Sequence, residues 1–268
     1  MILQHPINTP FLSVVDSLSL ALFFVIMGYE FLLFCYFMFI RFRKTGKLYW
    51  FYFALFFLFL LVSRGFFIVY DFYMPIWKTY IEYYGFTLPI VIYRLASFTG
   101  WLAAAMVVGI LSTLLFTKET NLHKSMAYIL PGVVIVIASL ILWLPPEYIV
   151  DPKYYTDVLQ IEVPVEIIPS PIFGDQYPVG LFYLNYIILP ILNFALPLLF
   201  FYLAAKSVGI IRKSSILNGL GFIIYYIGRS VQPLLKFGGN MLIQAFVPPL
   251  IILTGLLLLA IANFILQP

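Results

Sequence analysis

The sequence predicts an all-α integral membrane protein, a bundle of seven transmembrane helices that forms a single domain over residues 1–268. Composition gives the first reason: 63% of the residues are hydrophobic and only 10% are charged, whereas a soluble domain has about 25% charged residues. The second reason is that apolar residues gather in stretches of about 20, the length that a helix needs to cross a lipid bilayer. This composition excludes a soluble enzyme, a secreted disulfide-rich domain and a nucleic-acid-binding domain.

Seven apolar stretches follow one another along the chain. The sixth is the most polar of them, and the Gly238-Gly239 pair links it tightly to the seventh. Prolines within the fourth, fifth and seventh stretches remove backbone hydrogen bonds, so we expect the carbonyl groups that they free to need other partners. The expected spans are about residues 12–40, 48–70, 89–116, 126–144, 179–205, 216–235 and 241–266, and the prolines are Pro131, Pro190, Pro197, Pro248 and Pro249.

Charges in the connections predict the orientation of the bundle. Residues 145–178, between the fourth and fifth spans, hold six acidic residues and one lysine. Basic residues gather instead after the first, third and fifth spans. By the positive-inside rule this basic side is cytoplasmic, which places the amino terminus outside and the carboxyl terminus in the cytoplasm of a multi-pass cell membrane protein. The basic residues are Arg41, Arg43, Lys44, Lys47, Lys118, Lys124, Lys206, Arg212 and Lys213.

Two further expectations concern the amino terminus and the long connection between the fourth and fifth spans. Residues 1–10 lack a positively charged region, so we expect no cleavable signal peptide, and the first span remains as an anchor. In the long outer connection, residues 158–167 alternate between apolar and polar side chains. Such alternation predicts one or two short strands, broken by Pro164 and Pro169. We therefore expect a partly β-structured outer loop that covers the mouth of the bundle.

Ionisable residues within the spans are the candidates for a functional site, because charge is costly in hydrocarbon. Glu30 is the deepest, about 16 Å of helix away from Arg41. Asp16 lies nearly four turns before Glu30, on the same face. The other charged residues of the spans fall in the outer half, which predicts a polar cavity open to the outside. The candidate ligand-binding residues are Glu30, Arg64, Arg94, Arg229, Asp16, Asn185 and Gln244.

Three interpretations of these charges remain open at this point. They form interhelical ion pairs that fix the packing, a ligand-binding cluster, or an ion or proton path. Catalytic chemistry has little support, because the only histidines are His5 and His123 and neither lies in a span. The sequence has no metal-site spacing, phosphate-binding loop or hydrolase motif. We therefore expect no enzyme, no cofactor and no metal.

The expected function follows from the one-sided polar cluster, the acidic outer loop and the short basic connections. These features predict a receptor-like or sensory protein that binds a small ligand from outside, with an anion as one candidate. The arginines would contact such a ligand bidentately. A cytoplasmic or membrane partner chain would carry the signal onward. A small-solute transporter or channel, and a structural subunit of a larger membrane complex, are the alternatives, and no motif identifies a family.

Overall fold

The computed structural model describes residues 13–75, 87–115, 121–151, 154–159, 166, 168–171, 174–235 and 241–265. Nearly all of these residues are helical. Six helical segments are long and apolar enough to cross a membrane, so the chain is a multi-pass membrane protein. They are Val14–Thr45, Leu48–Tyr73, Leu88–Leu115, Ser125–Trp143, Phe182–Lys206 and Ala245–Phe264.

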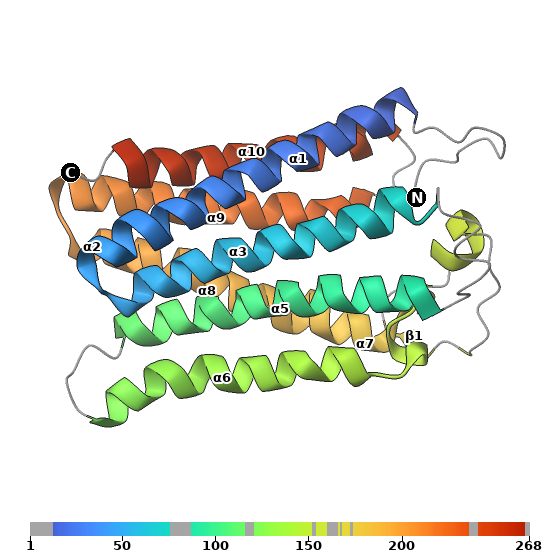
Figure 1. Ribbon diagram of the computed structural model, residues 1–268, viewed down its shortest axis with the longest axis horizontal. Helices are drawn as coiled ribbons and strands as arrows, with labels where there is room; N and C mark the ends of the chain where they lie inside the picture. Colours follow the sequence, from blue (N-terminus) through green and yellow to red (C-terminus); the bar gives the residue numbers. More distant parts are fainter. Residues whose placement is uncertain are drawn as a thin grey trace.

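The helices run roughly parallel to the long axis of the molecule (Figure 1). Several end in π-helical turns, labelled η1, η2, η5 and η6. The elements are α1 (Val14–Cys35), η1 (Tyr36–Phe42), α2 (Arg43–Thr45), α3 (Leu48–Ile68), η2 (Val69–Tyr73), α5 (Thr87–Leu115), α6 (Asn121–Trp143), α7 (Val179–Leu181), η5 (Phe182–Ile188), α8 (Leu189–Lys206), α9 (Gly209–Leu235), α10 (Met241–Ala260) and η6 (Ile261–Ile265).

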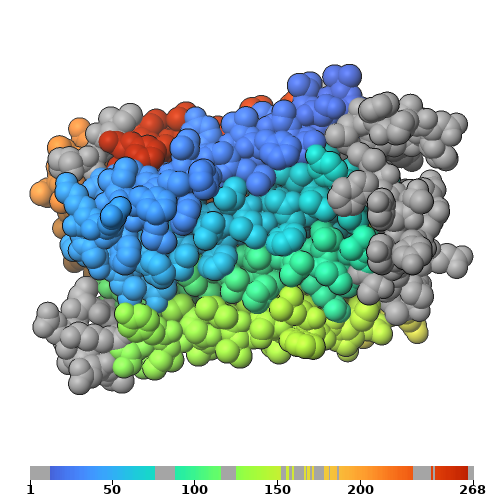
Figure 2. Space-filling model, in the orientation of Figure 1, coloured from blue at the N-terminus to red at the C-terminus, as the bar shows by residue number. Residues whose placement is uncertain are grey.

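Six of the long helices close a ring, in the order α1, α3, α5, α8, α9 and α10, and α10 packs back on α1. Helix α6 packs against α5 outside this ring. Figure 2 shows α1, α3, α5 and α6 side by side on one face. Because α6 touches few neighbours, its outward apolar side chains, such as Val136 and Trp143, are exposed and suit contact with lipid.

Helix α9 corresponds to the expected sixth span, but it is not apolar enough to count among the six candidate spans. Its polar side chains explain this. Ser214, Ser215 and Asn218 are buried, so they face neighbouring helices instead of lipid. A helix enclosed by other helices tolerates polar groups that a lipid-facing helix does not.

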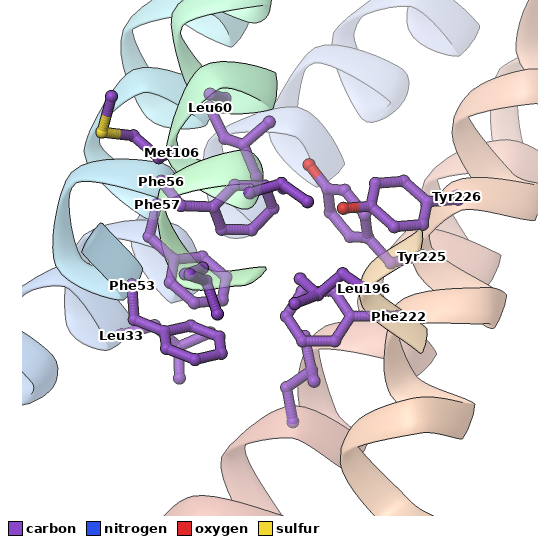
Figure 3. Close-up of a cluster of buried hydrophobic side chains, with 14 of the residues drawn as sticks. Leu33, Phe53, Phe56, Phe57, Leu60, Met106, Leu196, Phe222, Tyr225 and Tyr226 are labelled. Carbon is purple, nitrogen blue, oxygen red and sulfur yellow. The ribbon is translucent and has the colours of Figure 1, made fainter. Parts of the chain in front are cut away.

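Aromatic rings from α3 and α9 meet in the centre of the ring (Figure 3). Phe222 lies 5.8 Å from Phe56 and 6.3 Å from Phe53 between ring centroids. Leu33 of α1 and Leu196 of α8 are fully buried beside them. Such rings bury large apolar areas and pack edge to face or offset. These side chains pack together in the interior of the bundle.

The connection between α6 and α7, which the sequence analysis placed outside, contains two short strands, β1 (Pro169–Ser170) and β2 (Gly174–Pro178), which pair antiparallel. They lie after the segment in which strands were expected. Val158 and Leu159 belong instead to a π-helical turn, η4 (Tyr154–Leu159), and residues 160–165 and 167 lie outside the described part of the chain. A helical turn fits here because Tyr155 and Leu159, four residues apart, both pack into one apolar cluster.

Candidate functional site

Glu30 lies in the middle of α1, and its side chain is completely buried. The hydroxyl of Tyr225, from the middle of α9, donates a hydrogen bond to Glu30 Oε1 at 2.9 Å. The second oxygen, Oε2, is buried and has no hydrogen-bond partner among the described residues. A buried carboxyl oxygen without a partner is unfavourable by roughly 1–3 kcal/mol or more, so this half-satisfied carboxyl marks the site.

Close packing of α9 on α10 sets the position of Tyr225. A Cβ atom added to Gly255 would lie 2.7 Å from the backbone nitrogen of Tyr225 and 2.8 Å from the carbonyl oxygen of Gly221. The two backbones therefore touch directly, an approach that only glycine allows. Since α10 also packs on α1, this contact brings the Tyr225 hydroxyl within reach of Glu30.

Two arginines surround the carboxyl of Glu30. Arg64 and Arg229 both lie close enough to act electrostatically on it. Arg64, on α3, is buried, and its guanidinium carbon lies 5.0 Å from the centre of the Phe23 ring on α1. Within hydrocarbon-like surroundings, such charges interact strongly because the effective dielectric constant is low.

Arg229 reaches from α9 to α5. A Cβ atom added to Gly100 would lie 4.0 Å from Arg229 Nη2 and 3.2 Å from Ser63 Oγ on α3. Arg229 Nη2 therefore lies beside Gly100 of α5, and the closer neighbour of Gly100 is Ser63. We call Glu30, Arg64, Tyr225 and Arg229 the mid-bundle cluster, which joins α1, α3 and α9 and borders α5.

Tyr226 lies beside this cluster. Its hydroxyl is buried, has no hydrogen-bond partner within the described chain, and lies near Arg229. In Figure 3 the hydroxyl groups of Tyr225 and Tyr226 both point from α9 toward the side of the core where Leu60 lies. Glu30 Oε2 in the cluster and the Tyr226 hydroxyl beside it are thus two buried polar atoms without a hydrogen-bond partner among the described residues.

The structure brings three of the seven candidate residues together: Glu30, Arg64 and Arg229. Arg94 lies elsewhere, because its guanidinium group donates to the carbonyl oxygen of Leu144, at the outer end of α6. It also lies near Tyr155 of η4, where burial raises the pKa of the phenol above its ordinary value. Arg94 therefore attaches the outer connection to α5.

Asp16 is buried near the start of α1 and caps that helix. It lies in the first turn of α1, where the Ser13 hydroxyl donates to its Oδ2 at 2.7 Å and its own N–H donates to Ser13 Oγ at 3.1 Å. This is helix capping, about 21 Å of helix from Glu30. Asn185 is half-buried in η5, and the side chain of Gln244 in α10 lies outside the described part of the structure.

Sequence reasoning missed Tyr225 and Tyr226. A signal was present, because both precede Arg229 by one turn and so share a helix face with it. Their polar hydroxyl groups matter here because they are buried beside charges.

A second set of polar contacts lies toward the end of the bundle that carries η1 and the start of α9. The spans were expected to be nearly apolar there. The backbone carbonyl oxygen of Asn263 in η6 accepts hydrogen bonds from the Tyr36 hydroxyl at 2.6 Å and from Arg41 Nη2 at 3.3 Å. The Asn263 side chain donates to Asn218 Oδ1 at 2.7 Å. These contacts join η1, η6 and α9. We call them the basic-end network.

Two of the carbonyl groups that prolines free accept hydrogen bonds from side chains of other helices. Pro131 cannot donate to the carbonyl oxygen of Ala127 four residues earlier, and the Tyr52 hydroxyl of α3 donates to it at 2.9 Å. Pro249 leaves the carbonyl oxygen of Ala245 in the same situation, and Ser19 Oγ of α1 donates to it at 3.2 Å. At Pro131 and at Pro249, the freed carbonyl group thus forms a hydrogen bond that links two helices.

No group of three or more His, Cys, Asp or Glu residues in the described segments could hold a metal ion. Comparison with known proteins finds no matching family model, no matching curated protein and no matching solved structure.

Proposed function

We propose that this chain is a receptor-like or sensory protein of the cell membrane with seven transmembrane helices. In this proposal it binds a small anionic ligand at the mid-bundle cluster and signals through a partner chain. Helix α9 acts as the seventh span: its 27 residues extend about 40 Å, enough to cross a bilayer. Basic residues on one side and acidic residues on the other support an outside amino terminus.

The observation that carries the proposal is the half-satisfied carboxyl of Glu30 beside two arginines. Charged residues inside a bundle are rare and mark functional sites by default. Arginine presents a planar fork of donors that fits carboxylate and phosphate groups.

The ligand competes with the Glu30 carboxyl for the guanidinium groups of the two arginines. Glu30 Oε2 is enclosed by protein atoms, so an anion reaches the guanidinium groups only if the carboxyl of Glu30 gives way. That displacement breaks the contact between Glu30 and Tyr225, which holds α1 to α9. Both helices continue to the basic-end network, where Tyr36 and Asn218 contact Asn263. A rearrangement in the middle of the bundle therefore reaches the end at which a partner would bind.

This proposal is tested with the purified protein in nanodiscs and a panel of small anions: acetate, lactate, glutamate and phosphate. An anion whose concentration is one hundred times its Kd stabilises the protein by about 2.7 kcal/mol. We therefore expect at least one of the four anions to raise Tm. The shift should disappear in Arg229→Gln and persist in a matched Arg43→Gln control, since Arg43 is exposed at the basic end.

Two outcomes contradict the receptor proposal. In the first, none of the four anions changes Tm. In the second, the purified chain alone accumulates a labelled anion in proteoliposomes, which makes it a transporter. Purification in constant stoichiometry with several other chains, together with instability in their absence, would instead identify a structural subunit.

A further inference from the structure

The end of the bundle that carries η1, α2 and the start of α9 is strongly basic. Described residues 36–50 and 200–220 contain no acidic residue. Six basic side chains are exposed there: Arg43, Lys44, Lys47, Lys206, Arg212 and Lys213. We call this surface the basic end. The proposed function uses these charges for the orientation of the bundle and assigns them no ligand.

Contacts with η6 bring the two basic connections to the same end of the molecule. Ser214 Oγ, in the second turn of α9, donates to the carbonyl oxygen of Ala262 at 2.9 Å. Tyr36 and Arg41, which precede α2, donate to the next carbonyl group, that of Asn263. In Figure 1 the start of α9 and α2 accordingly lie at the same end, on the left of the view.

Apolar side chains are exposed beside these charges. Val208, Ile210 and Ile211 are 83%, 57% and 68% exposed, although each is aliphatic. In the sequence they lie between Lys206, the last residue of α8, and Arg212 and Lys213, near the start of α9. Lys206 Nζ also lies 6.0 Å from the centre of the exposed Tyr202 ring. Basic, aromatic and aliphatic residues occur together where a protein meets the boundary between lipid headgroups and acyl chains.

We propose that the basic end binds anionic phospholipids. Lys206, Arg212 and Lys213 contact the phosphate groups, and Ile210 and Ile211 insert among the upper parts of the acyl chains. An anionic lipid meets both features of this surface, because it offers negative charge and apolar area at the same depth. An acidic protein segment would match the charges alone. The inference goes beyond the proposed function and holds for whichever leaflet the basic end faces.

The test measures which lipids remain bound after purification from an equal mixture of phosphatidylcholine and phosphatidylglycerol. Wild type should retain phosphatidylglycerol preferentially. The variant K206Q/R212Q/K213Q should lose that preference by about tenfold or more, since each Lys or Arg near an anionic surface contributes roughly a fivefold effect. The matched control K206R/R212K/K213R keeps the charges and should behave as wild type.

A measurement on the wild type keeps the test valid if the neutral variant does not fold. Preference for phosphatidylglycerol should fall when the salt concentration rises, because exposed charges are screened. Equal retention of both lipids by wild type overturns the proposal, as does a preference that neither the neutral variant nor salt reduces. Binding of a polyglutamate peptide to protein in phosphatidylcholine nanodiscs, without competition from phosphatidylglycerol, also overturns it and assigns the basic end to an acidic protein partner.

Discussion

The hydroxyl of Tyr225 donates a hydrogen bond to Oε1 of Glu30 at 2.9 Å, and this contact joins the middle of α9 to the middle of α1. The two residues are 195 positions apart in the sequence. Glu30 thus has a direct polar partner in addition to the two arginines that act on it through space. The contact also explains how the most polar helix of the bundle is held with its polar face inward.

Replacement of Tyr225 by Phe tests this contact. The change keeps the ring and leaves the Glu30 oxygen that accepted this hydrogen bond without that donor, at a cost of about 1–3 kcal/mol. Tm should fall by several degrees, because roughly 1 kcal/mol shifts Tm by about 2–4 °C in a protein of this size. Tyr128→Phe is the matched control, since Tyr128 is 62% exposed. Equal Tm values for Tyr225→Phe and Tyr128→Phe would show that the contact between Tyr225 and Glu30 does not stabilise the protein.

The hydrogen bond from Tyr52 to the carbonyl oxygen of Ala127 gives a second prediction. Tyr52→Phe leaves that carbonyl without a donor, because Pro131 has no N–H, and should lower the free energy of unfolding by about 1–3 kcal/mol. In a Pro131→Ala background the new backbone N–H can donate instead, so the same change should cost less. Unfolding in detergent of the wild type, the two single variants and the double variant measures the cost of Tyr52→Phe in each background. Equal costs in both backgrounds would contradict this role for Pro131.

Glycine packing between α9 and α10 gives a third prediction. A Cβ atom at Gly255 would lie 2.7 Å from the Tyr225 nitrogen, so Gly255→Ala must push the helices apart at a cost of about 1–3 kcal/mol. Gly28→Ala is the control, because no atom lies within 4 Å of the added carbon. It should be neutral, or stabilising by up to about 1 kcal/mol. The prediction fails if Gly255→Ala melts at the same temperature as Gly28→Ala.

Orientation of the bundle is tested by thiol labelling in a Cys35→Ser background. Thr45 and Lys213 are exposed at the basic end, and Thr156 is exposed in the outer connection. With an outside amino terminus, a cysteine at Thr156 should react with a membrane-impermeant reagent in intact cells, and cysteines at Thr45 and Lys213 should react only after lysis. The reverse pattern would place the basic end outside.

Much of the fold follows from the sequence, because hydrocarbon thickness and the cost of buried charge fix where helices run. The segment over 48–70 and the one over 89–116 match α3 with η2, and α5, within a few residues at either end. Helix α9 is harder to assign by hydropathy alone, since its polar residues are satisfied by neighbours that only the tertiary structure supplies. The Asn218 side chain, for example, accepts from Asn263, 45 residues away.

The candidate site was predictable in part. Depth along a helix indicated Glu30, which is completely buried, but depth cannot say which helices are neighbours. Arg94 and Arg64 were expected at comparable depth, yet Arg94 contacts the end of α6 and Arg64 lies near Glu30. The contact between Tyr36 and Asn263 could not be predicted from the sequence for another reason. It uses a backbone carbonyl group in a π-helical turn, and no side-chain pattern in the sequence signals that acceptor.

The central claim is that Glu30 is charged and is balanced by the arginines of the mid-bundle cluster. The most direct test is a double-mutant cycle of Glu30→Gln and Arg64→Gln, with thermal unfolding of the purified proteins measured in detergent. If the pair is ionised, Glu30→Gln leaves a buried arginine uncompensated and should cost roughly 3–5 kcal/mol. The double variant should then recover much of that loss. A Glu30→Gln protein that melts like wild type, or a double variant whose loss equals the sum of the single losses, would contradict the account.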